Sequence, residues 1–121
     1  MNRLFWMAVV AILVCVLGGS VTAAAGTPTV LVFGLGERCN YCVELKKDIG
    51  RVKEKVGGAV RFQDVRVDQE FEMVKKHKVL LSPTLIFFDP TGAEVLRHQG
   101  ILDDEQILEK LATHKLWNGA T

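Results

Sequence analysis

The most strongly apolar stretch of the chain lies at its N-terminus. A short basic start, Met1-Asn2-Arg3, precedes an uninterrupted apolar run over residues 4–17, and small residues follow as far as Ala25. This order is typical of a secretory signal peptide, so we predict cleavage after Ala25 and a mature domain over residues 26–121. The alternative is that residues 1–25 stay attached and anchor the protein in the membrane. In either case we expect the domain to lie outside the cytoplasm, where disulfides persist.

Along the rest of the chain, segments with the apolar pattern of a strand are followed by segments with the apolar spacing of a helix. Residues 29–35 are apolar and rich in β-branched side chains, which predicts a strand buried on both faces. From Asn40 the apolar positions recur every three or four residues, which predicts a helix that ends at Gly57-Gly58. The stripe of this helix consists of Tyr41, Leu45, Ile49, Val52 and Val56.

The next two predicted elements are a strand and a short helix. Residues 60–67 have the pattern of a strand whose apolar face changes near Gln63-Asp64. Aspartate is a residue type that caps helix N-termini, so Asp68 is predicted to cap a short helix over residues 69–77.

The remaining elements are a hairpin and a final helix. An apolar strand over residues 84–88 and a second strand over residues 93–98 flank Asp89-Pro90-Thr91-Gly92, which is a tight-turn sequence. Asp103 or Asp104 then caps the last helix. The apolar positions of that helix are Ile107, Leu108 and Leu111. The predicted order is βαβ, then α, then ββα, which is an α/β fold in one domain.

Composition and charge exclude several classes of protein. Hydrophobic residues make up 49% of the chain and charged residues 24%, which excludes a disordered or low-complexity protein. The chain has 15 basic and 14 acidic residues, for a net charge of +1. Without an excess of positive charge, no nucleic-acid partner is indicated.

Two of the three cysteines form a Cys39-Asn40-Tyr41-Cys42 pair where the first predicted strand turns into the long helix. Cys39 would lie at the helix N-terminus, where unpaired backbone amides and the helix dipole stabilise a thiolate. Arg38 would add to this effect. Cys42, one turn further on, would be more buried and would resolve a mixed disulfide formed on Cys39. This arrangement predicts thiol–disulfide exchange, which requires no metal or other cofactor.

Three other interpretations of the cysteine pair remain open. A zinc site needs about four ligands, and beyond the pair the mature chain offers only His77, His98 and His114, at no ligand-like spacing. A purely structural disulfide would close a very small loop and would gain little entropy. A Cu(I) carrier would use the two thiolates as soft ligands.

Pro83 directly precedes the apolar strand over residues 84–88. Because proline lacks a backbone donor, it marks the start of a strand. Taken alone, the frequencies of X–Pro bonds favour an ordinary trans proline at this position.

Together these features resemble the thioredoxin family over nearly the whole mature chain, from Val30 to about Leu111. The resemblance is carried by the strand before the cysteine pair, the pair itself, the Asp68 region, Ser82-Pro83-Thr84, the hairpin through Gly92, and Gly100. It implies a trimmed thioredoxin fold: a four-stranded mixed sheet flanked by helices, without the first strand and helix of full-length thioredoxins.

The resemblance also implies roles for residues away from the cysteines. Pro83 would be a cis-proline opposite the pair, and the backbone of Ser82 would pair with an extended substrate chain beside Cys39. The other residues implied on this docking surface are Leu81, Gly100 and Ile101. Tyr41, between the cysteines, is a further candidate for substrate contact, with simple exposure as its alternative.

The departures from the family pattern concern the groups around the cysteines. Arg38 replaces the tryptophan that usually precedes the first cysteine. The buried acid of thioredoxins would fall at Phe33, and its lysine partner would fall at Asp64. Asp64 is therefore a candidate proton acceptor for Cys42, with a solvated strand carboxylate as the alternative. Glu37 is a second candidate.

We therefore predict an exported thiol–disulfide oxidoreductase that acts as a reductase on protein substrates. A membrane-bound thiol electron donor would reset it, and the reverse reaction would use the same residues. The rival hypotheses are a non-catalytic module that uses the thioredoxin fold to bind a partner, and a Cu(I) carrier. We expect a monomer that binds no nucleic acid.

Overall fold

The computed structural model describes residues 26–119, and the predicted signal peptide over residues 1–25 lies outside them. The described elements follow the predicted order. They are β1 (Thr29–Gly34), the 3-10 turn η1 (Gly36–Arg38), α2 (Asn40–Val56), the 3-10 turn η2 (Gly57–Ala59), β2 (Arg61–Arg66), α3 (Phe71–Lys76), β3 (Thr84–Phe88), β4 (Glu94–Gln99) and α4 (Asp104–Thr113). No helix within residues 26–119 has both the length and the apolar character needed to cross a membrane.

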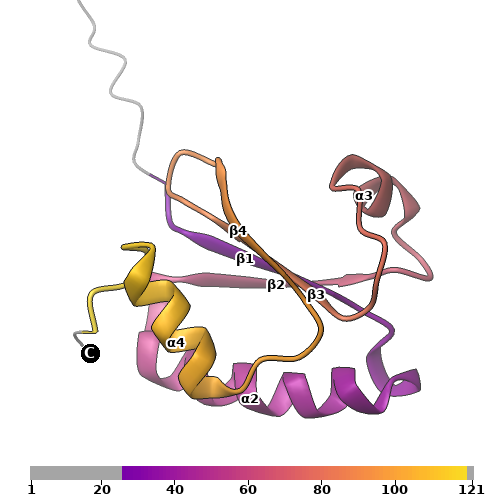
Figure 1. Cartoon of the computed structure of the whole chain (residues 1–121), viewed down its shortest axis with the longest axis horizontal. Coiled ribbons are helices and arrows are strands. Elements are labelled where there is room, and N and C mark those ends of the chain that lie inside the picture. The colour runs from indigo at the N-terminus through magenta and orange to yellow at the C-terminus, as the bar shows by residue number, and fades with distance from the viewer. Residues whose placement is uncertain (1–25, 120–121) are drawn as a thin grey trace, which may run out of the picture.

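The four strands form one mixed sheet in the order β2-β1-β3-β4 (Figure 1). β1 is parallel to β2 and antiparallel to β3, and β3 and β4 form the predicted hairpin. In this register Phe33 of β1 lies between Val65 of β2 and Thr84 of β3. β1 is thus an interior strand, buried from Val30 to Phe33, as predicted. The predicted four-stranded mixed sheet flanked by helices is confirmed.

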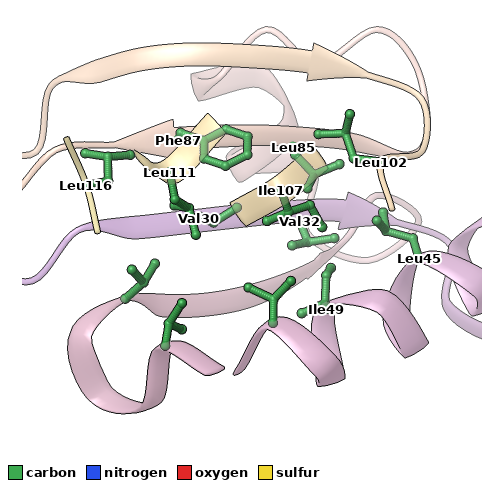
Figure 2. Packing of buried hydrophobic residues seen from close by; sticks show 13 residues of the cluster. Val30, Val32, Leu45, Ile49, Leu85, Phe87, Leu102, Ile107, Leu111 and Leu116 are labelled. Carbon is green, nitrogen blue, oxygen red and sulfur yellow. The ribbon is translucent and has the colours of Figure 1, made fainter. Parts of the chain in front are cut away.

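Two hydrophobic cores hold the helices on the sheet. α2 and α4 cover one face, and α3 lies on the other (Figure 1). The larger core lies between the sheet, α2 and α4, where aliphatic side chains surround Phe87 (Figure 2). Complete burial of one such side chain contributes about 1.5–3 kcal/mol, so this face fixes α2 firmly beneath the sheet. The smaller core consists of Leu31, Phe33, Val65, Val79 and Ile86.

The ends of α2 and α4 follow their sequence signals. α2 ends at Gly57, whose φ of 56° lies in the left-handed region that favours glycine. Asp103 caps α4: its carboxylate accepts a hydrogen bond from the Gln106 amide at 2.8 Å, and the Gln106 side chain accepts one from the Asp103 amide at 3.0 Å. Both helix boundaries were predicted correctly, with Asp103 as the cap rather than Asp104.

Two predictions about the helices were wrong. α3 is shorter than predicted and begins after Glu70, and Asp68 does not cap it. The reason is that the Asp68 carboxylate is already bound by the Arg66 guanidinium. Tyr41 does not belong to the buried stripe of α2, because its side chain is 67% exposed. Cys42 takes the inward position of the first turn instead, three residues before Leu45 on the same face.

Candidate active site

Cys39 and Cys42 form a disulfide where β1 turns into α2, and their Cα atoms are 5.1 Å apart. The chain leaves β1 at Gly34, passes through η1 and enters α2 with Cys39 as the N-cap residue. Gly36 permits the tight turn, because its φ of +62° lies in a region that glycine adopts without steric cost. The local fold therefore places the cysteine pair at the first turn of the longest helix.

The first turn of α2 distinguishes the two sulfurs. The backbone amide of Cys42 donates a hydrogen bond to Sγ of Cys39 at 3.0 Å. Such an amide, together with the positive end of the helix dipole, stabilises a thiolate at the N-terminus of a helix. Cys39 is partly exposed, whereas Cys42 is only 9% exposed. The arrangement makes Cys39 the accessible sulfur and Cys42 the buried one.

Two arginines and one aspartate lie beside the turn that carries Cys39. The Arg66 guanidinium donates hydrogen bonds of 3.1 and 2.9 Å to Asp68, and Nη1 of the exposed Arg38 lies 3.8 Å from the same carboxylate. The bonds from Arg66 are the main reason that the pKa of Asp68 is lowered, and Arg38 adds a smaller effect. Asp68 is therefore ionised at neutral pH and offsets part of the positive charge of Arg38.

The segment before β3 lies against the disulfide. The Ser82–Pro83 peptide bond is cis, as the resemblance implied, and Pro83 is buried. Oγ of Ser82 lies 3.7 Å from Sγ of Cys42. The backbone amide of Gly100 donates a hydrogen bond to the Pro83 carbonyl at 2.8 Å. The structure thus brings together Cys42, Ser82, Pro83 and Gly100.

Three apolar side chains are exposed: Leu81 and Ile101, which the resemblance implies on the docking surface, and Tyr41, the further candidate for substrate contact. The exposed fractions are 67% for Tyr41, 56% for Leu81 and 47% for Ile101. Large apolar side chains in solvent are typical of interaction surfaces when they lie together. Leu81 and Ile101 are close in sequence to the hydrogen-bonded Pro83 and Gly100, and Tyr41 lies between the cysteines. Their contact with substrate stays a prediction.

A cavity of about 490 Å³ borders Cys42 between α2 and the strands β1 and β2. The candidate proton acceptors Asp64 and Glu37 both line it, as does Pro83. Phe33, at the position of the buried thioredoxin acid, is fully buried. The acceptor role of the two carboxylates stays a prediction. Within residues 26–119, no three His, Cys, Asp or Glu side chains are grouped so that they could hold a metal ion.

Two contacts of the site were missed at the level of the sequence. One is the hydroxyl of Ser82 against Cys42. The other is Arg66, which packs against Gly36 so closely that a Cβ atom added there would lie 3.1 Å from Nη1. The Arg66 backbone amide also donates a hydrogen bond to the Glu70 carboxylate at 2.7 Å. The only signal in the sequence is that Arg66 lies near the end of the strand predicted over residues 60–67, two residues before Asp68.

Comparison with known proteins agrees with this fold. A family model described as a thioredoxin-like domain matches residues 20–115, whereas no curated protein matches the sequence. A thioredoxin-like protein from Clostridium perfringens has a TM-score of 0.69 and 26% identity, over 78% of this chain and 75% of that one. The thioredoxin of Fasciola hepatica has a TM-score of 0.65 and 27% identity, over 74% of this chain and 82% of that one.

A third solved structure shows the likeness at the level of the fold. The exposed lipoprotein thioredoxin of Streptococcus pneumoniae has a TM-score of 0.65 and 18% identity, over 74% of this chain and 86% of that one. The cysteine pair, bonded at the N-terminus of α2, supports a thiol–disulfide redox function. Because the family model spans most of the sequence and the sheet and helices agree with it, this chain belongs to the thioredoxin-like domain family.

Proposed function

We propose that this protein carries out thiol–disulfide exchange on protein substrates outside the cytoplasm, and that it acts as a reductase. The observation that carries this proposal is the placement of Cys39 and Cys42 at the N-terminus of α2, with Cys39 the more accessible sulfur. A sulfur that accepts a hydrogen bond from a helix amide reacts as a thiolate near neutral pH.

The different environments of the two sulfurs set the order of the exchange steps. In the reduced protein the Cys39 thiolate attacks one sulfur of a substrate disulfide, and the other substrate sulfur leaves as a thiolate. Cys42 then loses its proton and attacks Sγ of Cys39, which breaks the mixed disulfide and releases the second substrate sulfur. The substrate gains two electrons and takes up two protons through solvent. The protein is left with the Cys39–Cys42 disulfide.

The groups around the cysteine pair bear on the direction of exchange. By resemblance, strongly oxidising relatives carry a large helical insertion, whereas only the short α3 connects β2 and β3 here. Arg38 favours the opposite direction, because its charge stabilises the reduced thiolate form, but Asp68 offsets part of that charge. A membrane-bound thiol donor would return two electrons to the disulfide after each cycle.

The location outside the cytoplasm rests on two features. Residues 1–25 have the pattern of a secretory leader, and a disulfide such as Cys39–Cys42 persists in oxidising compartments. A cleaved leader would give a periplasmic or secreted protein, and an uncleaved one would give a membrane-anchored protein. Sequencing the N-terminus of the exported protein tests this, because cleavage after Ala25 predicts a mature start at Gly26.

A trapping experiment tests the exchange reaction. Cys42→Ser removes the sulfur that resolves mixed disulfides, so partner proteins from an extracytoplasmic extract should accumulate on Cys39. Cys39→Ser should trap none at position 39. Electrophoresis with and without dithiothreitol, followed by mass spectrometry, identifies the partners. The wild-type protein should also accelerate the reduction of insulin by dithiothreitol, and both variants should lose this activity.

The same proteins separate the proposal from its rivals. A wild-type protein that exchanges no disulfide but binds one Cu(I) ion tightly would be a copper carrier. A protein that captures partners without any mixed disulfide would be a non-catalytic binding module. Either result would contradict the proposed oxidoreductase.

A further inference from the structure

The buried sulfur of the pair has one polar side chain next to it. Oγ of Ser82 lies 3.7 Å from Sγ of Cys42, a distance at which a hydroxyl hydrogen-bonds sulfur. Within residues 26–119, Ser82 is the only side chain that forms a hydrogen bond with this atom, which is bonded covalently to Sγ of Cys39. The contact joins residues 40 positions apart in the sequence, so it is a product of the fold.

Cys42 needs such a partner because of where it is buried. Burial in apolar surroundings disfavours the charged form of a thiol. Cys42 packs close to Gly34, where an added Cβ atom would lie 3.2 Å from its sulfur. Phe33 stands where thioredoxins have a buried acid, and it supplies no polar group. Cys42 must nevertheless ionise before it can attack the mixed disulfide on Cys39.

The charged groups near Cys42 do not replace the hydroxyl. Those that line the adjoining cavity are Glu37, Arg38, Lys46, Asp64 and Arg66. All of them are exposed or partly exposed, and none forms a hydrogen bond to Sγ of Cys42 among the residues that the structure describes. Ser82 is exposed as well, but its hydroxyl contacts the sulfur directly. Their effects on the sulfur are therefore long-range and reduced by solvent.

We infer that the Ser82 hydroxyl is a catalytic hydrogen-bond donor that stabilises the Cys42 thiolate during resolution of the mixed disulfide. This inference rests on the proposed exchange function and assigns the Ser82 side chain a role separate from substrate pairing by its backbone. A donor that bonds the charged form of an acid favours its ionisation. The Ser82 hydroxyl therefore favours the Cys42 thiolate at a site where the buried carboxyl of thioredoxins is missing.

The step is balanced without any further reactant. The Cys42 thiol gives its proton to a base, either solvent or one of the candidate acceptors Asp64 and Glu37, and the Ser82 hydroxyl keeps its own proton while it donates to the thiolate. The electron pair of the Cys42 sulfur forms the new bond to Sγ of Cys39. The bond between Cys39 and the substrate sulfur breaks, and the substrate sulfur leaves with the electron pair of that bond.

Stopped-flow kinetics with an aromatic disulfide that releases a coloured thiolate at each step tests the inference. The first phase reports the attack by Cys39, and the second reports resolution by Cys42. Ser82→Ala should slow the second phase about tenfold, the effect of losing one hydrogen bond to a charged group. It should leave the first phase unchanged and shift the pH midpoint of the second phase upward.

Two further variants keep the result interpretable. Ser82→Thr retains a hydroxyl and should restore the second phase to within about twofold of wild type. Thr84→Val removes a buried hydroxyl that bonds the Leu81 carbonyl at 2.6 Å in the same segment. It should lower the stability of the protein without slowing the second phase.

Several outcomes would overturn the role of Ser82. The first is a second phase of wild-type rate in Ser82→Ala. The second is a second phase that slows in Thr84→Val as much as in Ser82→Ala. The third is a second phase that slows in Asp64→Asn but not in Ser82→Ala. Each of these leaves the first phase of the wild-type protein intact. Absence of the first phase in the wild-type protein would instead contradict the proposed exchange function.

Discussion

At the scale of single residues, the two cysteines are prepared for different steps. Sγ of Cys39 accepts a hydrogen bond from a helix amide and is partly exposed. Sγ of Cys42 is buried, and its polar neighbour is the hydroxyl of Ser82. The charge beside Cys39 is set by Arg38 and Asp68 together. Substitution of either charged residue should therefore change the pKa of the Cys39 thiol without changing the fold.

Asp68→Asn should lower the pKa of the Cys39 thiol. The substitution removes a negative charge and leaves the positive charge of Arg38 without its partner, and both changes favour the thiolate. Because the reduced form is then stabilised, the reduction potential should rise. Arg38→Ala should have the opposite effects. The ultraviolet absorbance of the thiolate as a function of pH gives the pKa, and equilibration with glutathione gives the potential.

Asp48→Asn is the matched control for Asp68→Asn. Asp48 is also paired with an arginine, Arg51, but on a part of α2 nearly two turns beyond Cys42. It should leave the Cys39 titration unchanged. A titration that is the same in wild type, Asp68→Asn and Arg38→Ala would show that these charges do not act on Cys39.

The residues of the site differ in how far the sequence reveals them. Cys39 and Cys42 could be placed because their spacing and their position after an apolar strand are local properties. Pro83 could be placed only through resemblance, since its residue type alone favours a trans bond. The contacts of Ser82 with Cys42 and of Arg66 with Gly36 could not be predicted, because both join segments that meet only in the folded chain.

At the scale of elements, the predictions succeeded where local patterns and tertiary packing agree. β1 is apolar on both faces and occupies the interior of the sheet. α2 keeps its stripe from Leu45 to Val56 and ends at a glycine. The start of α3 was mispredicted because Asp68, a good capping residue in isolation, bonds Arg66 in the fold.

The turn between β1 and α2 is the element that positions Cys39. Gly36→Ala tests how far this turn depends on glycine at position 36. A non-glycine residue at this positive φ costs about 1–2 kcal/mol. The added Cβ would also press on the Arg66 guanidinium, which Asp68 holds with two hydrogen bonds. We expect Gly36→Ala to destabilise the protein by more than the backbone cost alone, as measured by urea unfolding.

Gly57→Ala separates the two causes. Gly57 has a similar φ of +56°, but an added Cβ atom would meet nothing within 4 Å. Gly57→Ala should therefore show the backbone cost only, and it should leave the reaction of Cys39 with an aromatic disulfide unchanged. Equal losses of stability in the two variants would refute a packing role for Arg66 against the turn.

At the scale of the whole molecule, the sheet and its two cores connect the redox state to stability. The segments that meet at the cysteines come from β1, α2 and the chain before β3, and each is anchored by residues of the two cores. A bond between Cys39 and Cys42 constrains the unfolded chain, whereas ionisation of Cys39 stabilises the reduced native state. The direction of exchange depends on which effect is larger.

The free energies of unfolding of the oxidised and reduced forms should decide the direction. A four-residue disulfide loop is worth about 2 kcal/mol in the chain-entropy model. If the protein is a reductase, this term exceeds the stabilisation of the Cys39 thiolate, so the oxidised form should be the more stable. Urea unfolding followed by circular dichroism measures the free energy of unfolding of both forms. The difference between these free energies gives the reduction potential relative to an unfolded dithiol, at about 1.4 kcal/mol per 30 mV.

Cys42→Ala, which cannot form the bond, is the control and should unfold identically with and without reductant. A reduced form more stable than the oxidised one would show that the protein is an oxidase, because it gains stability when its disulfide is transferred to a substrate dithiol.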